Sequence, residues 1–253
     1  MMVCGVVGTG VVAPWLAVVA DGLTASGLVR LTSAPVPAVV GRTLLTAVVV
    51  TLVSLPLAVG QAYAVRRSRG LLRALGVLSC AVPTVLNALV VTLAWLVILQ
   101  RGGVLDTAAQ VLGLPGGAVR FLYQPGSSLV AMVYAVVPMM ALVVLAGMLR
   151  LDPQSHEAAL LLGARRRHLL LLDLGALARP LTLAAMVAYL AVLNLHLVTE
   201  YLSGPAMGQL GQLVQQYVLT SYDVAAAAAA ALVLAALAGI PLLVTAAIDR
   251  RPP

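Results

Sequence analysis

Long uncharged apolar runs, each about as long as a membrane span, follow one another along most of the chain. The clearest are Thr43–Val65, Ala74–Gln100, Phe121–Leu149, Pro180–Thr199 and Val224–Ile248, and Met1–Ala20 is a weaker sixth. Each reaches the roughly 20 residues that a helix needs to cross about 30 Å of hydrocarbon. Polar and apolar residues do not alternate with a period of two, so the pattern predicts helices rather than membrane strands.

The pattern therefore predicts an all-α membrane protein with one transmembrane domain over residues 1–253. The expected spans are about 2–20, 43–65, 74–100, 127–149, 180–202 and 224–248. We expect the first span to be a retained helix, because it lacks the basic start of a cleaved signal and further spans follow.

Two shorter features are an amphipathic segment on the predicted outer side and an alanine run at the start of the last span. Apolar residues at helical spacing in Leu210–Val218 predict a short amphipathic helix at the outer membrane interface. Seven alanines, Ala225–Ala231, open the last span and offer a smooth surface for close helix packing.

Charge adds orientation to this picture. The chain is 62% hydrophobic and 9% charged, whereas a soluble domain has about a quarter charged residues. All basic side chains are arginine, and they lie mainly in two loops and the C-terminal tail: Arg66, Arg67, Arg69, Arg73, Arg150, Arg165, Arg166, Arg167, Arg179, Arg250 and Arg251. Because positive residues stay on the cytoplasmic side, both termini are expected there. No solvated basic domain exists, so a nucleic-acid partner is not expected.

Several enzyme and cofactor classes do not fit the sequence. A P-loop needs a lysine, and the chain contains none. Cys4 and Cys80 are distant residues in separate apolar runs, which suits neither a disulfide nor a metal site. His156-Glu157 lacks the second histidine of an intramembrane metalloprotease. We therefore expect no catalytic residue, no metal and no cofactor in this chain.

A polar loop over residues 152–179 interrupts the apolar pattern. Asp152-Pro153 is a good helix start, and Gly163 is a plausible helix end. Two interpretations are open at this point. The loop could be a basic segment bound to anionic lipid head groups, or it could be a docking element for a cytoplasmic partner.

The residues of this loop resemble a known motif. Glu157-Ala158-Ala159, three residues and then Gly163 reproduce the E-A-A-x-x-x-G motif, and Arg179-Pro180 is similar to its R-P ending, although Gly175-Ala176 replaces the usual leucine-proline pair. The chain thus resembles the permease subunits of bacterial type I ABC importers. The resemblance implies the six-helix MetI-like fold and an ATPase-coupling site at Glu157, Ala158, Ala159, Gly163, Arg165 and Arg166.

The resemblance runs from Arg42 to about Arg251. Stretches such as AWLVILQRGGVLDTAAQVLGL and VTEYLSG look most like the spermidine/putrescine group, which is similar to permeases for iron, thiamine and phosphonates. It implies a small polar or cationic substrate such as a polyamine, with an iron, thiamine or phosphonate-type substrate as the alternative. Val91 stands where many spermidine-type permeases have an arginine.

The resemblance also implies partners and a location. ATPase subunits would bind ATP and Mg and dock on the loop over 152–179. A second permease subunit, identical or homologous, would complete the pathway, and an extracytoplasmic solute-binding protein would deliver the substrate. The protein would lie in the lipid of the bacterial inner membrane as a multi-pass importer subunit.

Polar residues within the spans are candidates for the translocation path. They are Asn87, Asn194, His196, Thr199 and Glu200. His196 and Glu200 are four residues apart and share a helix face, so the carboxylate could attract a cationic solute. A stabilising Glu–His pair at a helix end is the alternative. An ion-coupled secondary transporter is the alternative of another class, although it would bury more ionisable groups in mid-span.

Overall fold

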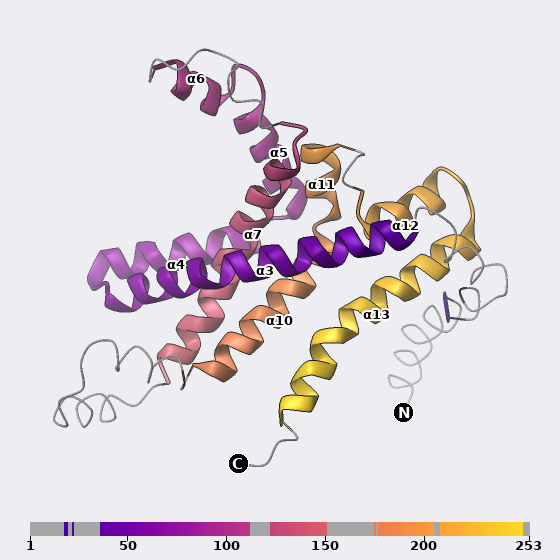
Figure 1. Cartoon of the computed structure of the whole chain (residues 1–253). Helices are drawn as coiled ribbons and strands as arrows, with labels where there is room; N and C mark the ends of the chain where they lie inside the picture. The colour runs from indigo at the N-terminus through magenta and orange to yellow at the C-terminus, as the bar shows by residue number, and fades with distance from the viewer. Residues whose placement is uncertain are drawn as a thin grey trace, which may run out of the picture.

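The protein is built from helices. The computed structural model describes residues 18–19, 22, 36–111, 122–150, 175, 177–204 and 208–249, and no strand occurs among them. The helices are α3 (Val36–Arg67), α4 (Gly70–Val85), α5 (Ala88–Leu99), α6 (Val104–Val111), α7 (Pro125–Met148), α10 (Ala178–Asn194), α11 (His196–Ser203), α12 (Leu210–Leu219) and α13 (Val224–Asp249) (Figure 1). The predicted all-α class is confirmed.

Several stretches of helix have the length and apolar character of membrane spans. Within the described residues, four stretches qualify: α3, Ala88–Val111, Gly126–Met148 and Val224–Leu243. A fifth is formed if α10 and α11, which are bent by 55° relative to each other, make one span. The predicted span over 2–20 lies outside the described residues apart from Val18 and Val19, so the number six stays a prediction.

The predicted span over 74–100 differs from the structure. This run is two helices, since α4 ends at Val85 and α5 begins at Ala88. Leu86 and Asn87 between them are extended, with ψ angles of 136° and 139°. The Asn87 side chain accepts a hydrogen bond from the Leu89 amide at 2.9 Å, and such capping starts a new helix. Hydropathy does not predict this break, because the residues on both sides of it are mainly apolar.

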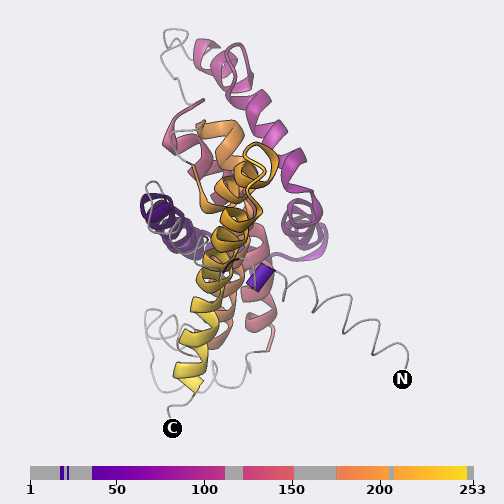
Figure 2. The same cartoon turned by 90° about the vertical axis from the view of Figure 1, so that its right-hand side faces the viewer.

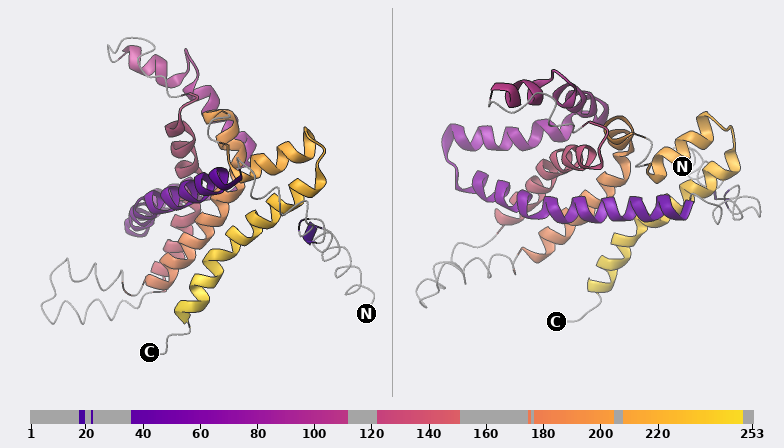
Figure 3. Two further views of the ribbon diagram at one scale, coloured as in Figure 1. Left: turned by 45° about the vertical axis from the view of Figure 1, so that its right-hand side comes forward. Right: turned by 45° about the horizontal axis from the view of Figure 1, so that its top comes forward.

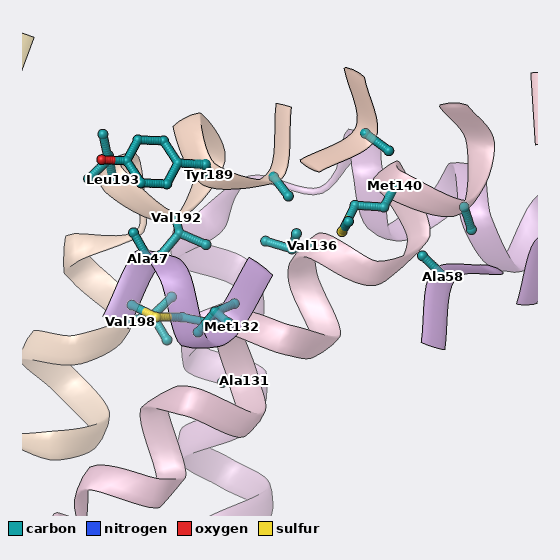
Figure 4. Close-up of a cluster of buried hydrophobic side chains, with 14 of the residues drawn as sticks. Ala47, Ala58, Ala131, Met132, Val136, Met140, Tyr189, Val192, Leu193 and Val198 are labelled. Atoms are coloured by element: carbon teal, nitrogen blue, oxygen red, sulfur yellow. The ribbon is translucent and has the colours of Figure 1, made fainter. Parts of the chain in front are cut away.

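The core is centred on one face of α7. Met132, Val136, Met140, Val144 and Met148 follow one another at four-residue spacing, and each is at most 3% exposed. Residues four apart lie on the same face of a helix, and this face packs mainly against α3 and α10. Figure 4 shows the α7 side chains among Ala47 of α3 and Val192 of α10. The helix α7 is therefore the centre of the bundle.

Small residues let α3 approach this centre closely. Ala47, Ser54, Ala58 and Ala62 are fully buried on one side of α3, and small side chains are typical of helix contacts in membranes. The opposite side carries large apolar residues such as Leu45 and Leu52, which are 68% and 64% exposed. Small residues toward the bundle and large apolar residues on the outer surface are the distribution that a hydrocarbon environment favours.

The last helix lies along the edge of the bundle. Figure 2 shows α13 running beside α10, which it contacts. The predicted helix over Leu210–Val218 is confirmed as α12, and it folds back on α13 as a hairpin (Figure 3). The alanine run is also in contact, since Ala226–Ala230 are buried and a Cβ on Gly22 would lie 3.1 Å from the Ala228 backbone.

The close approach of α7 and α10 gives a testable prediction. A Cβ at Gly147 would lie 2.5 Å from Pro180 Cβ and Cγ, so Gly147→Ala should push the two helices apart. We expect a loss of about 1–3 kcal/mol in the free energy of unfolding, as for other overpacked contacts. Denaturation of the detergent-solubilised protein by SDS would measure it.

Gly60→Ala in α3 is the matched control. No atom lies within 4 Å of an added Cβ there, so alanine should be neutral or stabilising by up to about 1 kcal/mol. Equal effects of the two substitutions would contradict the tight α7–α10 contact.

Candidate functional site

The predicted ATPase-coupling residues lie outside the described residues: Glu157, Ala158, Ala159, Gly163, Arg165 and Arg166. The two ends of their loop are described. Gly147 near the end of α7 packs against Pro180 in the first turn of α10, and Leu177 beside them is buried. The loop therefore leaves and re-enters the bundle at neighbouring points. Pro180 suits its position, because the first turn of a helix needs no amide hydrogen there.

The fifth apolar run is broken between α10 and α11. The 55° bend lies at Leu195, which is outside both helices. Asn194 donates from its side-chain amide to the Leu190 carbonyl at 2.9 Å. An asparagine side chain that bonds a carbonyl of the preceding turn competes with the backbone hydrogen bonds of the helix. No proline lies between Asn194 and His196. The bend thus coincides with a bond from a side chain to the backbone, and α11 beyond it contacts α5, α7 and α12.

Hydroxyl groups fasten the end of α11 to the start of α7. Ser203 Oγ lies 2.6 Å from Ser128 Oγ and donates to the Gln124 carbonyl at 3.0 Å. Ser127 Oγ donates to the Leu202 carbonyl at 2.9 Å, and the Tyr123 amide donates to the same carbonyl at 2.8 Å. Because Ser127, Ser128 and Ser203 are buried, their bonds replace water at both helix ends. Residues far apart in sequence are therefore held as one unit, the serine clamp (residues 123–128 and 202–203).

A second polar contact fastens α12 to α3. Thr43 Oγ1 accepts a hydrogen bond from the Leu210 amide at 2.9 Å and donates to the Val39 carbonyl at 2.8 Å. Thr43 is buried, and the Leu210 amide is one of those that a helix start leaves without a backbone partner. The Gln209 amide is bound in turn by Gln212 Oε1 at 2.8 Å. The start of α12 is therefore fixed against α3.

An open polar cleft lies between α3, α11 and α12. Its volume is about 640 Å³. The lining residues are Val39, Arg42, Glu200, Gly208, Gln209, Gln212, Leu213, Gln215, Gln216, Leu219 and Thr220. A guanidinium, a carboxylate and several side-chain amides thus converge on one hollow surface, which can bind a small polar molecule by charge and hydrogen bonding. We call it the α12 cleft.

The five predicted path residues lie at different places in the bundle, and their role in the path stays a prediction. Of the five, only Glu200 lines the α12 cleft. Asn87 caps α5, and Asn194 bonds its own helix at the bend. The side chain of His196 packs against Gly211 of α12, and Thr199 is 2% exposed. Within the described part of the chain, no hydrogen bond or ion pair joins the side chains of His196 and Glu200.

The cleft also contains residues that the sequence interpretation did not single out. Arg42, Gln212, Gln215 and Gln216 are not among the predicted path residues. The glutamines lie on the polar side of the amphipathic helix, whose apolar residues Leu210 and Leu213 are buried. The polar side of the predicted amphipathic helix is therefore the sequence feature that could have indicated these glutamines. No group of three potential metal ligands occurs among the described residues.

The fold and this site define a class before any comparison. Apolar helices of span length, a broken helix and an open polar cleft are typical of helical membrane transport proteins. The family model of the binding-protein-dependent transport system inner membrane component matches residues 51–252. Because the match covers most of the chain, the protein belongs to this family. It is a permease subunit of an ABC importer, a transport component rather than an enzyme.

Solved structures share the fold. The crystal structure of a bacterial alginate ABC transporter, in complex with a periplasmic protein bound to alginate pentasaccharide, is similar at a TM-score of 0.83 and 16% identity, over 99% of this chain and 93% of that chain. The crystal structure of a bacterial ABC transporter involved in the import of the acidic polysaccharide alginate is also similar, with a TM-score of 0.79 and 17% identity. The match covers 95% of this chain and 90% of that chain. At these identities the likeness concerns fold alone, and the spermidine/putrescine subgroup stays a prediction.

The attachment of α12 can be tested at Thr43. Thr43→Val keeps the shape of the side chain and removes the acceptor of the Leu210 amide. We expect the free energy of unfolding to fall by about 1–3 kcal/mol, the usual cost of leaving a buried donor without a partner. Hydrogen exchange should also become faster at Leu210 and the first turn of α12.

Thr92→Val is the control, because Thr92 is equally buried and its hydroxyl bonds only the Ala88 carbonyl of its own helix at 2.7 Å. It should change stability little and leave the exchange of α12 unaltered. Unchanged exchange at Leu210 in Thr43→Val would show that Thr43 does not hold α12.

Proposed function

We propose that this permease transmits work from a separate ATPase to a pathway for a small polar solute. The motif Glu157-Ala158-Ala159 with Gly163 carries this proposal. It lies in the loop that connects α7 to α10, and these two helices meet at the contact of Gly147 with Pro180. A push on the loop would therefore reach α7, the central helix of the bundle.

The chemistry of the motif suits docking onto a protein. The small side chains of Ala158 and Ala159 let another surface approach closely, and Glu157 could pair with a basic group. Gly163 permits a sharp turn after a short helix. Arg165 and Arg166 would hold the loop at the cytoplasmic surface and could touch the ATPase. ATP and Mg would be bound by that partner, because a chain without lysine cannot form a P-loop.

The complete importer would contain two permease subunits and two ATPase subunits. The permease partner would be a second copy or a homologous chain, and closure of the ATPase pair would move the coupling loops and re-orient the spans. A solute-binding protein would deliver the substrate on the outer side. One similar solved structure is a complex that contains a periplasmic protein, which supports this arrangement for the present chain.

The substrate is proposed from the sequence resemblance and the α12 cleft. The spermidine-like stretches favour a small polar or cationic solute, with iron, thiamine and phosphonate-type compounds as the alternative. Alginate is named for the similar structures, but a fold likeness at low identity does not transfer it. An ion-coupled secondary transporter is not favoured, since the family is that of binding-protein-dependent systems.

Substitutions in the motif test the coupling role. Glu157→Lys or Gly163→Asp should abolish co-purification of the ATPase, because one reverses a charge and the other blocks the turn. ATP hydrolysis by the reconstituted complex should fall to the background. Insertion into the membrane should persist, since no span is altered.

His156→Gln is the matched control in the same loop, because no role is assigned to His156. It should retain both the ATPase subunit and its hydrolysis. If Glu157→Lys and Gly163→Asp also retain both, the motif is not the docking contact.

The isolated subunit gives a further test. Purified without partners, the chain should hydrolyse no ATP above the rate of a detergent blank, because it has no lysine for the phosphates. A malachite-green phosphate assay would measure this. Sustained hydrolysis by a preparation free of other chains would refute a separate ATPase subunit.

A further inference from the structure

A second hollow, apolar where the α12 cleft is polar, lies between α3, α4, α5 and α7. Its volume is about 850 Å³, and it is open rather than enclosed. Leu57 of α3, Leu75 of α4 and Val133 of α7 line it, together with Trp95 and Tyr134. These two rings meet edge to face at 5.6 Å between their centroids. None of the described lining residues carries a charge. We call this hollow the α4 groove.

The helix α4 gives the groove an apolar and accessible wall. Of its 16 residues only Cys80 is buried, and Leu75, Leu78 and Val82, which line the groove, are 51%, 53% and 54% exposed. Lipid tails are as apolar as leucine and are the natural neighbours of such side chains in a bilayer. A flexible acyl chain can enter an open groove of this kind sideways, without an enclosed cavity.

The groove offers little to a polar solute. Ser79 is one of its few polar lining residues, and its hydroxyl already donates to the Gly76 carbonyl of its own helix at 2.8 Å. Gln61 is another, and it lies in the part of α3 that leads to the turn into α4. The apolar chemistry of the lining therefore favours a hydrocarbon chain as the occupant.

A cluster of arginines lies at one end of the groove, where α3 turns into α4. Figure 3 shows these two helices side by side, and they are in contact. The cluster, which we call the arginine turn, consists of Arg66, Arg67, Arg69 and Arg73. Gln61 precedes Arg66 by about 8 Å of helix rise, and Leu75 follows Arg73 by about 3 Å. Both Gln61 and Leu75 line the groove, so the arginine turn adjoins it.

The charge of the arginine turn is not compensated by the described residues. Its guanidinium groups make no hydrogen bond or ion pair with any of them, and no acidic residue occurs in the sequence between Asp21 and Asp106. Four or more arginines or lysines at the end of a span are typical of contacts with anionic lipid head groups. A second copy of the chain fits less well, because a twofold contact through this face would bring two such clusters together.

We propose that the α4 groove and the arginine turn together bind an anionic phospholipid. One acyl chain lies in the groove against Leu75, Leu78 and Trp95, and the phosphate lies among the guanidinium groups. Neither part would select the lipid alone, since the groove recognises any hydrocarbon and the arginines recognise any anion. The site is independent of the transported solute.

Trp95 can report directly on the occupant of the groove. Trp15 is the other tryptophan of the chain, so Trp15→Phe leaves Trp95 as the single reporter. The full-length chain would be placed in phosphatidylcholine vesicles with rising shares of a phospholipid whose acyl chains carry bromine, which quenches tryptophan fluorescence on contact. We expect brominated phosphatidylglycerol to quench Trp95 at a mole fraction at least about fivefold lower than brominated phosphatidylcholine, the attraction of one arginine.

Substitutions in the arginine turn test the head-group contact. Arg73→Gln should weaken the preference for phosphatidylglycerol, and Arg73→Gln with Arg67→Gln should bring the two lipids to near-equal quenching. The conservative pair Arg67→Lys and Arg73→Lys should keep the preference, because the charge remains. Arg101→Gln is the matched control for Arg73→Gln, since Arg101 is exposed and does not line the groove.

Filling the groove tests the acyl-chain contact. Ser79→Phe should lower the quenching of Trp95 by both brominated lipids, because the added ring would occupy the space of the chain. Val85→Phe is the matched control on the same helix, since Val85 is 85% exposed and lies outside the groove. It should leave both the quenching and the preference unchanged. A single symmetric gel-filtration peak shows that a variant is folded.

Several results would overturn the site. Equal quenching by the two lipids in the parent chain would mean that the head group is not selected. Quenching by neither lipid would mean that protein, such as a second copy, covers the groove. Unchanged quenching in Ser79→Phe would place the lipid elsewhere. Arginine variants that keep the lipid preference but no longer co-purify with the ATPase would make the arginine turn an ATPase contact instead.

Discussion

The packing of α7 against α3 and α10 is the interaction on which the other elements depend. Hydrocarbon supplies no hydrophobic force between helices, so contact has to come from close fit and internal hydrogen bonds. Met132, Val136 and Met140 provide the fit on α7, while Ala47 and Ala58 let α3 come near. The serine clamp adds hydrogen bonds at one end of α7, and Gly147 on Pro180 closes the other. Both ends of α7 are thereby fixed to other segments of the chain.

Two asparagines interrupt apolar runs with consequences for the shape of the bundle. Asn87 starts α5 after two extended residues, and Asn194 accompanies the 55° bend before α11. Both use the side-chain amide to bond nearby backbone, at 2.9 Å in each case. In a membrane this matters, because exposed backbone groups have no water to bond. Backbone geometry thus accounts for both polar residues, and their role in the path stays a prediction.

The α12 cleft depends on contacts between segments that are distant in sequence. Arg42 and Glu200 are brought to one surface because α11 bends away from the axis of α10 and α12 is fixed to Thr43. The same arrangement removes His196 from the cleft, since it packs against Gly211. One hydrogen bond on α3 therefore bears on the geometry of a cleft to which α3 itself contributes Arg42 and α11 contributes Glu200.

The sequence by itself determined the class, the helical character and the family motif. Runs of apolar residues dictate helices in a membrane, the spacing of Leu210 and Leu213 predicted α12, and Glu157 to Gly163 indicated a partner ATPase. Tertiary structure alone decided the break at Asn87, the bend at Leu195 and the placement of Arg42 and Glu200 on one cleft. Hydropathy reports the average environment of a segment, whereas a site is made by contacts over more than 150 residues of chain. The polar residues were visible in the sequence, and only packing decided which of them meet.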